Sequence, residues 1–255
     1  MSRIPGALLL ATAGFLVAGV ASAGDNPAGA PDGWSLPLPD SELRYFVLAE
    51  QLEFRLNDED DLARWEIESW LGGDYNKVWL KTEGEWQTSG PSDGDGEVQL
   101  LYGRTIAPFW DFQVGVRQDV LFGSGSDRER TFAVIGVEGL APYWFELTPA
   151  LFVSDDGDLS FRLEGTYDLL LTQRLVLQPR VELNAALQDA RRFGVESGFN
   201  NLELALRLRY EIRREFAPYI GVNWLKKLGD TADLARDEGE DTSAVGFILG
   251  LRVWF

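Results

Sequence analysis

Carboxylates are the side chains of this sequence that are most able to do chemistry. The 255 residues include 41 Asp and Glu against 23 Lys and Arg, no Cys and no His, and the single Met is the initiator. Soft sulfur and imidazole ligands are therefore missing beyond Met1, whereas carboxylate oxygens suit hard cations. This composition predicts at most weak binding of divalent cations. It also excludes Ser-His-Asp and Cys-His catalysis, and the acidic balance disfavours nucleic acid as a partner.

Ionised side chains alternate with apolar ones along several stretches. From 202 to 213 the even positions are Leu, Tyr or Ile, and five of the six odd positions are Glu or Arg. A period of two separates an apolar from a polar face only in a strand. We predict an inward-facing polar network of Arg162, Glu164, Asp168, Arg180, Glu182, Glu203, Arg207, Arg209 and Glu211. Both an ion-pair network that holds the shape and a polar path for a cation are compatible with this pattern.

Carboxylates two positions apart, such as Glu66 and Glu68 or Glu83 and Glu85, suggest a second kind of chemistry. Two carboxylates on one strand face are the groups that glycoside hydrolysis needs. Nothing else in the sequence supports hydrolysis, and the commonest neutral-pH acid and base, His, is absent. We predict that the protein is not an enzyme.

The elements that position these side chains are long strands. Twelve are predicted, at 43–56, 62–72, 76–88, 97–106, 111–122, 130–140, 143–153, 158–170, 174–188, 200–213, 217–226 and 244–255. Many exceed the usual soluble strand of about 5–6 residues and match the 9–11 that a tilted membrane strand requires. No apolar run beyond residue 42 is long enough for a membrane helix. The sequence predicts an all-β fold, a transmembrane antiparallel up-and-down β-barrel of about 12 strands over residues 42–255.

The joins between these strands predict how the barrel is oriented. Tight joins (GGDY, APFW, LAPY, LTQR and EFAP) alternate with polar ones, of which KKLGDTADLARDEGEDTSA is the longest. In outer-membrane barrels the short turns face the periplasm and the longer loops face the exterior. Aromatic residues in the tight joins suit a girdle at the membrane interface. An even number of strands places both ends of the barrel at the tight rim.

The stretch VGFILGLRVWF at the end of the chain fits the strand that closes such a barrel. Val245, Phe247, Leu249, Leu251, Val253 and Phe255 form one apolar row. A closing strand that ends on Phe is typical of proteins inserted by the barrel assembly machinery, which we expect as a partner. The alternative, a soluble sandwich or lipocalin-like barrel, would have to keep long apolar rows in water.

Acidic residues gather in the joins that we place outside the cell. For Asp237, Glu238, Glu240 and Asp241 we predict a weak metal site at the rim. Solvated loop carboxylates bridged by divalent cations to lipopolysaccharide are the simpler interpretation. The more specific interpretation is that these carboxylates attract metal cations electrostatically and concentrate them at the mouth of the barrel. The spacing is not that of an EF-hand loop.

The beginning of the chain predicts export. Arg3 precedes the apolar run ALLLATAGFLVAGV, and Ala21-Ser22-Ala23 supplies the small residues of a cleavage site. We predict a signal peptide over 1–23 and an irregular Pro- and Gly-rich leader over 24–41. Together with the barrel, these features predict location in a bacterial outer membrane.

From about residue 64 the chain resembles the copper-resistance protein B family of bacterial outer membranes. The stretches that carry the resemblance are WLGGDYNKVWLKTEGE, GLAPYWFELTPALFVSDDGDLSFRLEGTYDLLLTQRLVLQPRVELN, LRLRYEIRREFAPYIGVNWLKKLGDTADLARDEGED and the terminal RVWF. The resemblance implies copper resistance or copper homeostasis, with copper as the bound or transported ion and a periplasmic copper protein as a further partner. It also implies the outer membrane and its lipopolysaccharide as surroundings.

One difference from the family bears on copper. Its members often carry a Met- and His-rich segment ahead of the barrel, whereas DNPAGAPDGWSLPLP has neither residue. We therefore expect any copper held here to be Cu(II) on carboxylates, since Cu(I) has no soft ligand. The alternative function is a structural or general small-solute barrel that has lost its copper ligands. An outer-membrane hydrolase is a third, disfavoured alternative.

Overall fold

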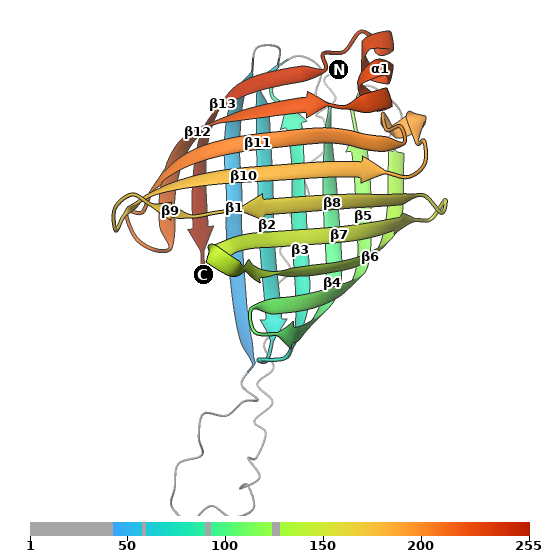
Figure 1. Ribbon diagram of the computed structural model, residues 1–255. Coiled ribbons are helices and arrows are strands. Elements are labelled where there is room, and N and C mark those ends of the chain that lie inside the picture. Colours follow the sequence, from blue (N-terminus) through green and yellow to red (C-terminus); the bar gives the residue numbers. More distant parts are fainter. Residues whose placement is uncertain (1–42, 58–59, 90–92, 124–127) are drawn as a thin grey trace, which may run out of the picture. The chain divides into compact units, whose positions relative to one another are not determined.

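The architecture is that of a closed antiparallel β-barrel, and it comes from a computed structural model that describes residues 43–57, 60–89, 93–123 and 128–255. Strands that follow one another in the chain are paired, except that β8 (Leu159–Thr166) and β9 (Leu169–Leu170) both pair with β10 (Leu175–Ala186). The last strand, β13 (Ser243–Trp254), pairs with β1 (Arg44–Asn57), and the sheet thereby closes on itself (Figure 1). The predicted signal peptide (1–23) and leader (24–41) lie outside the described residues. No helix within the described ranges is long and apolar enough to cross a membrane.

The strands have the following bounds. They are β1 (Arg44–Asn57), β2 (Leu62–Gly72), β3 (Asn76–Gln87), β4 (Gly94–Ala107), β5 (Trp110–Phe122), β6 (Arg128–Ala141), β7 (Phe145–Ser154), β8 (Leu159–Thr166), β9 (Leu169–Leu170), β10 (Leu175–Ala186), β11 (Gly198–Tyr210), β12 (Phe216–Lys227) and β13 (Ser243–Trp254).

The twelve predicted strands are confirmed, with one interruption. The predicted strand 158–170 is divided into β8 and β9 at residues 167 and 168, although both pieces keep one register against β10. Pro179 of β10 stands opposite this break, where its carbonyl accepts a hydrogen bond from the Tyr167 N–H at 3.2 Å. Proline has no N–H to return the bond, so the ladder is interrupted there.

An apolar belt covers the outer wall of the barrel. Leu206, Val222 and Phe247 lie on neighbouring strands and are exposed, while the side chains that alternate with them point inward and are mostly buried. Hydrocarbon offers no hydrogen bonds, so only a closed ladder with such a belt is stable in it. The described strands therefore carry the pattern of a membrane-spanning barrel.

Closure of the barrel depends on the pairing of β13 with β1. Leu48 stands opposite Trp254, and the backbone of Phe255 exchanges two hydrogen bonds with Val47, of 2.9 and 3.1 Å. Val245, Phe247 and Leu249 are exposed on the outer face, whereas Ile248 between them is buried in the interior. These are the faces that the sequence predicts.

The tight joins form one rim, but the contrast with the other rim is smaller than predicted. The joins at 73–75, 108–109, 142–144, 171–174 and 211–215 are short. On the other rim 58–61 and 155–158 are no longer than 171–174, so for these two the expectation of a long join is wrong. The longest joins on that rim are 187–197 and 228–242.

Exposed aromatic side chains occupy strained positions in two of the tight turns. Phe109, Tyr143 and Trp144 have φ of 67°, 69° and 69°, in the left-handed region that favours glycine. All three rings are exposed. A left-handed backbone conformation costs about 1–2 kcal/mol for each such residue. Anchoring of the exposed rings at the membrane interface offsets this cost.

A helix occupies the join at 228–242, which the sequence analysis treats only as a long loop. Helix α1 (Gly229–Glu238) buries Thr231, Ala232 and Ala235, and it ends at Gly239, whose φ of 81° closes the last turn. Its Thr231 Oγ1 accepts a hydrogen bond of 2.9 Å from Asn200 Nδ2 near the start of β11. The helix is thereby fixed to the rim.

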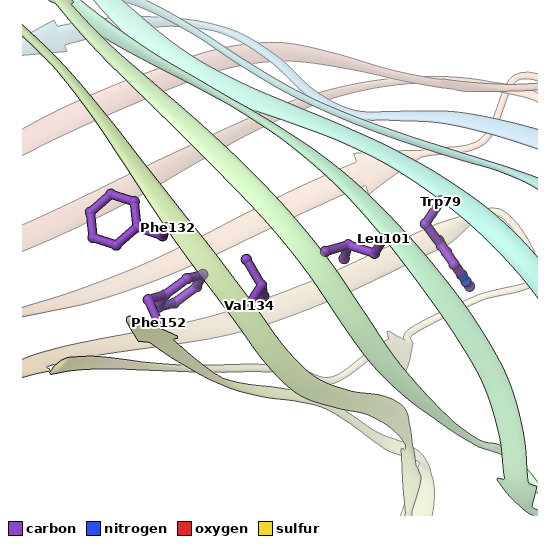
Figure 2. Packing of buried hydrophobic residues seen from close by; sticks show 5 residues of the cluster. All are labelled: Trp79, Leu101, Phe132, Val134 and Phe152. Atoms are coloured by element: carbon purple, nitrogen blue, oxygen red, sulfur yellow. The ribbon is translucent and has the colours of Figure 1, made fainter. Parts of the chain in front are cut away.

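A patch of apolar side chains lies inside the barrel, where the sequence analysis expects polar ones. Trp79, Leu101, Phe132, Val134 and Phe152 take inward positions on β3, β4, β6 and β7 (Figure 2). Phe132 and Phe152 meet edge to face with ring centroids 6.2 Å apart. The lumen is therefore partly filled with hydrophobic side chains.

An arginine on the outer wall is expected to prevent assembly. Leu206→Arg places a charge in the belt at a cost of roughly 2–4 kcal/mol near the membrane midplane, so we expect loss of the heat-modifiable folded band in electrophoresis. Leu187→Arg, in the join outside the strands, is the matched control and should fold. Normal folding of Leu206→Arg would contradict the lipid-facing assignment.

Candidate functional site: the charged lumen

A β-bulge in β1 shapes one wall of the lumen. The register against both neighbouring strands shifts between Ala49 and Leu52, around Glu50 and Gln51. Such an extra residue re-aims the side chains beside it. Glu50 lines an internal cavity, and Gln51 beside it is fully buried and donates to Glu66. The bulge thus turns two consecutive polar residues inward.

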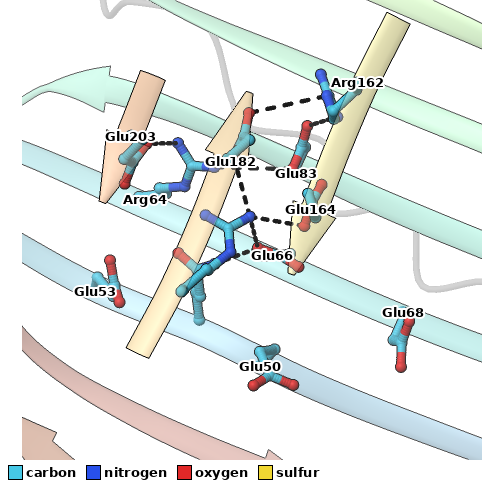
Figure 3. Close-up of polar contacts among 12 residues, drawn as sticks. Glu50, Glu53, Arg64, Glu66, Glu68, Glu83, Arg162, Glu164, Glu182 and Glu203 are labelled. Atoms are coloured by element: carbon cyan, nitrogen blue, oxygen red, sulfur yellow. Dashed lines mark hydrogen bonds and ion pairs between the residues drawn. The ribbon is translucent and has the colours of Figure 1, made fainter. Parts of the chain in front are cut away.

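Glu182 is the centre of the ion-pair network. Its carboxylate lies 3.1 Å from Arg180 Nη2, 3.7 Å from Arg64 Nη2 and 3.9 Å from Arg162 Nε. Asn184 Nδ2 donates a further hydrogen bond of 2.8 Å. One buried carboxylate from β10 therefore faces three guanidinium groups, as Figure 3 shows.

Arg162 reaches across the lumen from β8. Its guanidinium pairs with Glu83 of β3, and its Nη2 lies 3.0 Å from Glu97 Oε2 of β4. Around the sheet, β3 is five positions and β4 four positions away from β8. The contact therefore joins opposite walls.

Arg180 and Arg64 make two more crossings. Arg180 Nη2 of β10 lies 3.3 Å from Glu66 Oε2 of β2 and 2.9 Å from Glu164 Oε2 of β8. Arg64 Nη1 of β2 lies 3.8 Å from Glu203 Oε2 of β11. Together with Arg162, these arginines tie the walls together in the middle of the barrel.

A second group of ion pairs joins β11 to β1. Arg207 donates to Glu53 Oε1 at 2.6 Å and to Gln51 Oε1 at 2.9 Å. Arg55 Nε lies 2.8 Å from the other oxygen of Glu53, and the Tyr219 hydroxyl donates to Glu53 at 3.0 Å. All five side chains are buried, so the group serves to hold the wall rather than to meet solutes.

The remaining predicted network residues lie toward the tight-turn rim. Arg209 Nη2 lies 2.6 Å from Asp168 Oδ2 and 3.7 Å from Glu211 Oε1. Glu211 also pairs with Arg214 at 2.8 Å. The Asp168 side chain is 44% exposed, so this residue sits at the edge of the network and not within it.

Two internal cavities flank the crossing arginines. The cavity toward the tight-turn rim measures about 100 Å³. The other cavity lies toward the opposite rim, which carries the joins at 187–197 and 228–242, and measures about 380 Å³. In the larger one Arg117 pairs with Asp119 and Glu97, each at 2.5 Å, and stacks on Phe152. The lining of this larger cavity contains five arginines and seven acidic residues, a more balanced composition than that of the smaller cavity.

The smaller cavity is strongly acidic. Eight glutamates line it against three basic residues: Glu50, Glu66, Glu68, Glu83, Glu97, Glu138, Glu146 and Glu164, with Lys81, Arg162 and Arg180. Lys81 Nζ pairs with Glu138 and lies 3.8 Å from Glu68 and 5.2 Å from the centre of the Trp79 ring. The surplus of carboxyl oxygens over basic groups offers ligands to cations rather than to anions.

The carboxylates of the predicted metal site at the rim are more exposed than those of the lumen. Asp237 and Glu238 end helix α1, Glu240 and Asp241 follow it, and all four are exposed. Glu240 pairs with Lys227 Nζ at 2.6 Å. Within the described ranges no group of three or more acidic side chains is arranged to hold a metal ion. The rim site therefore stays a prediction.

On the same rim, the join at 187–197 is folded on itself. The backbone N–H of Ser197 donates to Asp189 Oδ1 at 2.9 Å, and this hydrogen bond lowers the pKa of Asp189. The joins of this rim thus include a locally ordered carboxylate besides those at 237–241.

Several lumen residues are absent from the sequence prediction. The carboxylate pairs Glu66/Glu68 and Glu83/Glu85 are noted there only as a hydrolase motif, yet Glu66, Glu68 and Glu83 pair with basic residues. Their period-two spacing is the same signal that identifies the network residues of β10 and β11. The other missing members are Gln51, Glu53, Arg55, Arg64, Lys81, Glu97, Arg117 and Glu138.

Comparison with known proteins identifies the family. The model of the copper resistance protein B precursor family matches residues 43–255. Copper resistance protein B of Escherichia coli is 47% identical over 216 residues, which cover 85% of this chain and 71% of that protein. The chain belongs to the copper resistance protein B family. A homologue from Pseudomonas syringae pv. tomato is 38% identical with the same coverage.

Solved structures agree on the fold. The NanC porin superposes with a TM-score of 0.51 at 16% identity, covering 82% of this chain and 99% of that one. The KdgM porin gives 0.50 at 10% identity, covering 82% and 98%. This copper resistance protein B family member is accordingly an outer-membrane barrel, as the sequence predicts.

Removal of the central carboxylate should destabilise this family member. Glu182→Ala leaves three guanidinium groups without their shared partner, and breaking a buried pair costs about 3–5 kcal/mol. Urea unfolding in lipid vesicles should show the loss. The exposed Glu240→Ala removes one surface pair and should cost less than about 1 kcal/mol. Equal stabilities of the two variants would contradict a structural role for Glu182.

Proposed function

We propose that this protein supports copper resistance by letting copper ions pass, or by holding them weakly, in the lumen at the outer membrane, without enzymatic activity. The single observation that carries the proposal is the acidic cavity, with eight glutamates against three basic side chains. Its carboxylates suit Cu(II) and other cations that accept oxygen ligands. The chain contains no Cys or His and has Met only at position 1, so Cu(I) has no soft ligand beyond Met1.

Passage fits the geometry better than tight chelation. The carboxylates of the cavity are spread over several strands, and many already have a basic or amide partner, such as Glu138 with Lys81 and Gln113. A path requires sites that are weak enough to release the ion. The dispersed carboxylates meet that requirement.

A structural or general small-solute barrel is the second candidate function. The observation that favours it is the set of arginines that cross the lumen and neutralise part of its acidic charge. Ion pairs of this kind hold a barrel in shape whether or not an ion passes. Growth of a deletion strain in the presence of copper distinguishes copper passage from a purely structural or small-solute barrel.

The proposed function predicts a copper phenotype. A strain that lacks the protein should tolerate less copper than the wild type, and its cellular copper content should change. The wild-type gene should restore both. Glu68→Gln/Glu146→Gln removes two carboxyl groups from the acidic cavity, so this variant should restore copper tolerance and cellular copper only in part. Glu215→Gln, an exposed carboxylate in the 211–215 turn, is the matched control. Unchanged tolerance and unchanged copper content in the deletion strain would leave the structural barrel as the function.

The rim carboxylates Asp237, Glu238, Glu240 and Asp241 are assigned a supporting role, that of concentrating cations at the exterior mouth. Their exposure supports long-range attraction rather than chelation. Replacing all four by Asn or Gln should slow Cu(II) uptake into proteoliposomes at low ionic strength. The difference should vanish near 0.15 M salt, where the Debye length is about 8 Å. A salt-independent difference would point to direct binding instead.

Three partners belong to the same proposal. The outer-membrane location makes lipopolysaccharide a neighbour of the exterior loops, where exposed carboxylates such as Asp156 suit bridging divalent cations. Exposed Phe255 at the end of β13 supports recognition by the barrel assembly machinery. A periplasmic copper protein would deliver or receive ions at the tight-turn rim, next to the acidic cavity.

A further inference from the structure

The two cavities of the lumen share four lining residues, and one of them is an arginine that crosses the lumen. Residues that line both are Glu83, Glu97, Phe152 and Arg162. Among the arginines of the described ranges that cross the lumen, Arg180 lines only the smaller cavity and Arg64 only the larger one. Arg162 is thus the crossing arginine placed between them.

The contacts of Arg162 hold it in that position from several sides. Its guanidinium pairs with Glu83 and Glu97 on the opposite wall, and its Nε faces Glu182 at 3.9 Å. The Phe152 ring lies against it, with its centroid 5.6 Å from Cζ. The side chain is only 14% exposed. A charged, well-held group therefore fills the passage.

We propose that Arg162 is a barrier between the two cavities that limits the passage of small cations without preventing it, and that it determines the ion selectivity of the path. The positive charge repels cations, and the side chain occupies the space between the cavities. This inference deepens the proposed passage of cations and rests on it for its biological meaning.

Removal of Arg162 changes both space and charge. The alanine variant lacks the guanidinium that separates the cavities, so the two volumes become continuous. Glu83, Glu97 and Glu182 then share one fewer counter-ion. A ring of carboxylates lining a pore favours cations. The opened path should therefore prefer K⁺ over Cl⁻.

The experiment measures ion conductance of the folded protein in planar lipid bilayers with KCl. Arg162→Ala should conduct at least about fivefold more than the wild type, with a reversal potential in a KCl gradient that shows cation selectivity. Arg162→Gln keeps hydrogen-bond donors at the position and serves as the second variant if the alanine variant does not fold. It should increase conductance in the same direction by a smaller factor.

Arg117→Ala is the matched control. Arg117 is as buried as Arg162 and contacts the same Glu97, but from the neighbouring strand β5, and it lines only the larger cavity. Because Arg117 does not stand between the cavities, its removal should raise conductance by a smaller factor than removal of Arg162. Folding of each variant is checked by heat-modifiable migration.

The outcomes distinguish this inference from the proposed function. Wild-type conductance of folded Arg162→Ala and Arg162→Gln, or an equal increase in Arg117→Ala, would overturn the barrier, as would an anion-selective increase. None of these results depends on copper. A cation-selective increase in Arg162→Ala together with an unchanged copper phenotype of the deletion strain would support the barrier and reject copper passage.

Discussion

An ionised side chain cannot face hydrocarbon without a large cost in free energy, and this constraint organises the whole barrel. Each strand alternates an outward apolar side chain with an inward one, so the charges of the strands collect in one narrow space. Burial there would also be unfavourable for a single charge. The inward carboxylates and guanidinium groups accordingly pair, and Glu182 with its three arginines is the densest point of that pairing.

The same pairing makes the lumen a compromise between shape and passage. Arginines from β2, β8 and β10 reach carboxylates on opposite walls and brace the cylinder. The apolar cluster of Trp79, Leu101, Phe132, Val134 and Phe152 fills part of the space that remains. What is left is an acidic cavity on one side and a larger mixed cavity on the other. Because the chain belongs to the copper resistance protein B family, copper is the ion that we propose for these cavities.

Period-two alternation made the strands predictable from the sequence, because it depends only on neighbouring residues. Local irregularities were harder to predict. The bulge at Glu50 and Gln51 breaks the period of two, and the helix formers of α1, such as Leu234 and Ala235, stand in a short acidic stretch that has the composition of a loop. The inward-facing aromatic residues were missed because period two defines a face without fixing its polarity. Partners across the lumen, such as Arg162 and Glu83, are 79 residues apart, and only the closed shape brings them together.

The pairing of β13 with β1 also constrains biogenesis. These strands stand at the two ends of the barrel sequence, with Leu48 opposite Trp254. Until they pair, the sheet is open and has two unsatisfied edges, which are prone to join other chains. A nascent chain therefore needs continuous shielding along both edges, and a product truncated before β13 would remain a candidate for proteolysis rather than a smaller barrel.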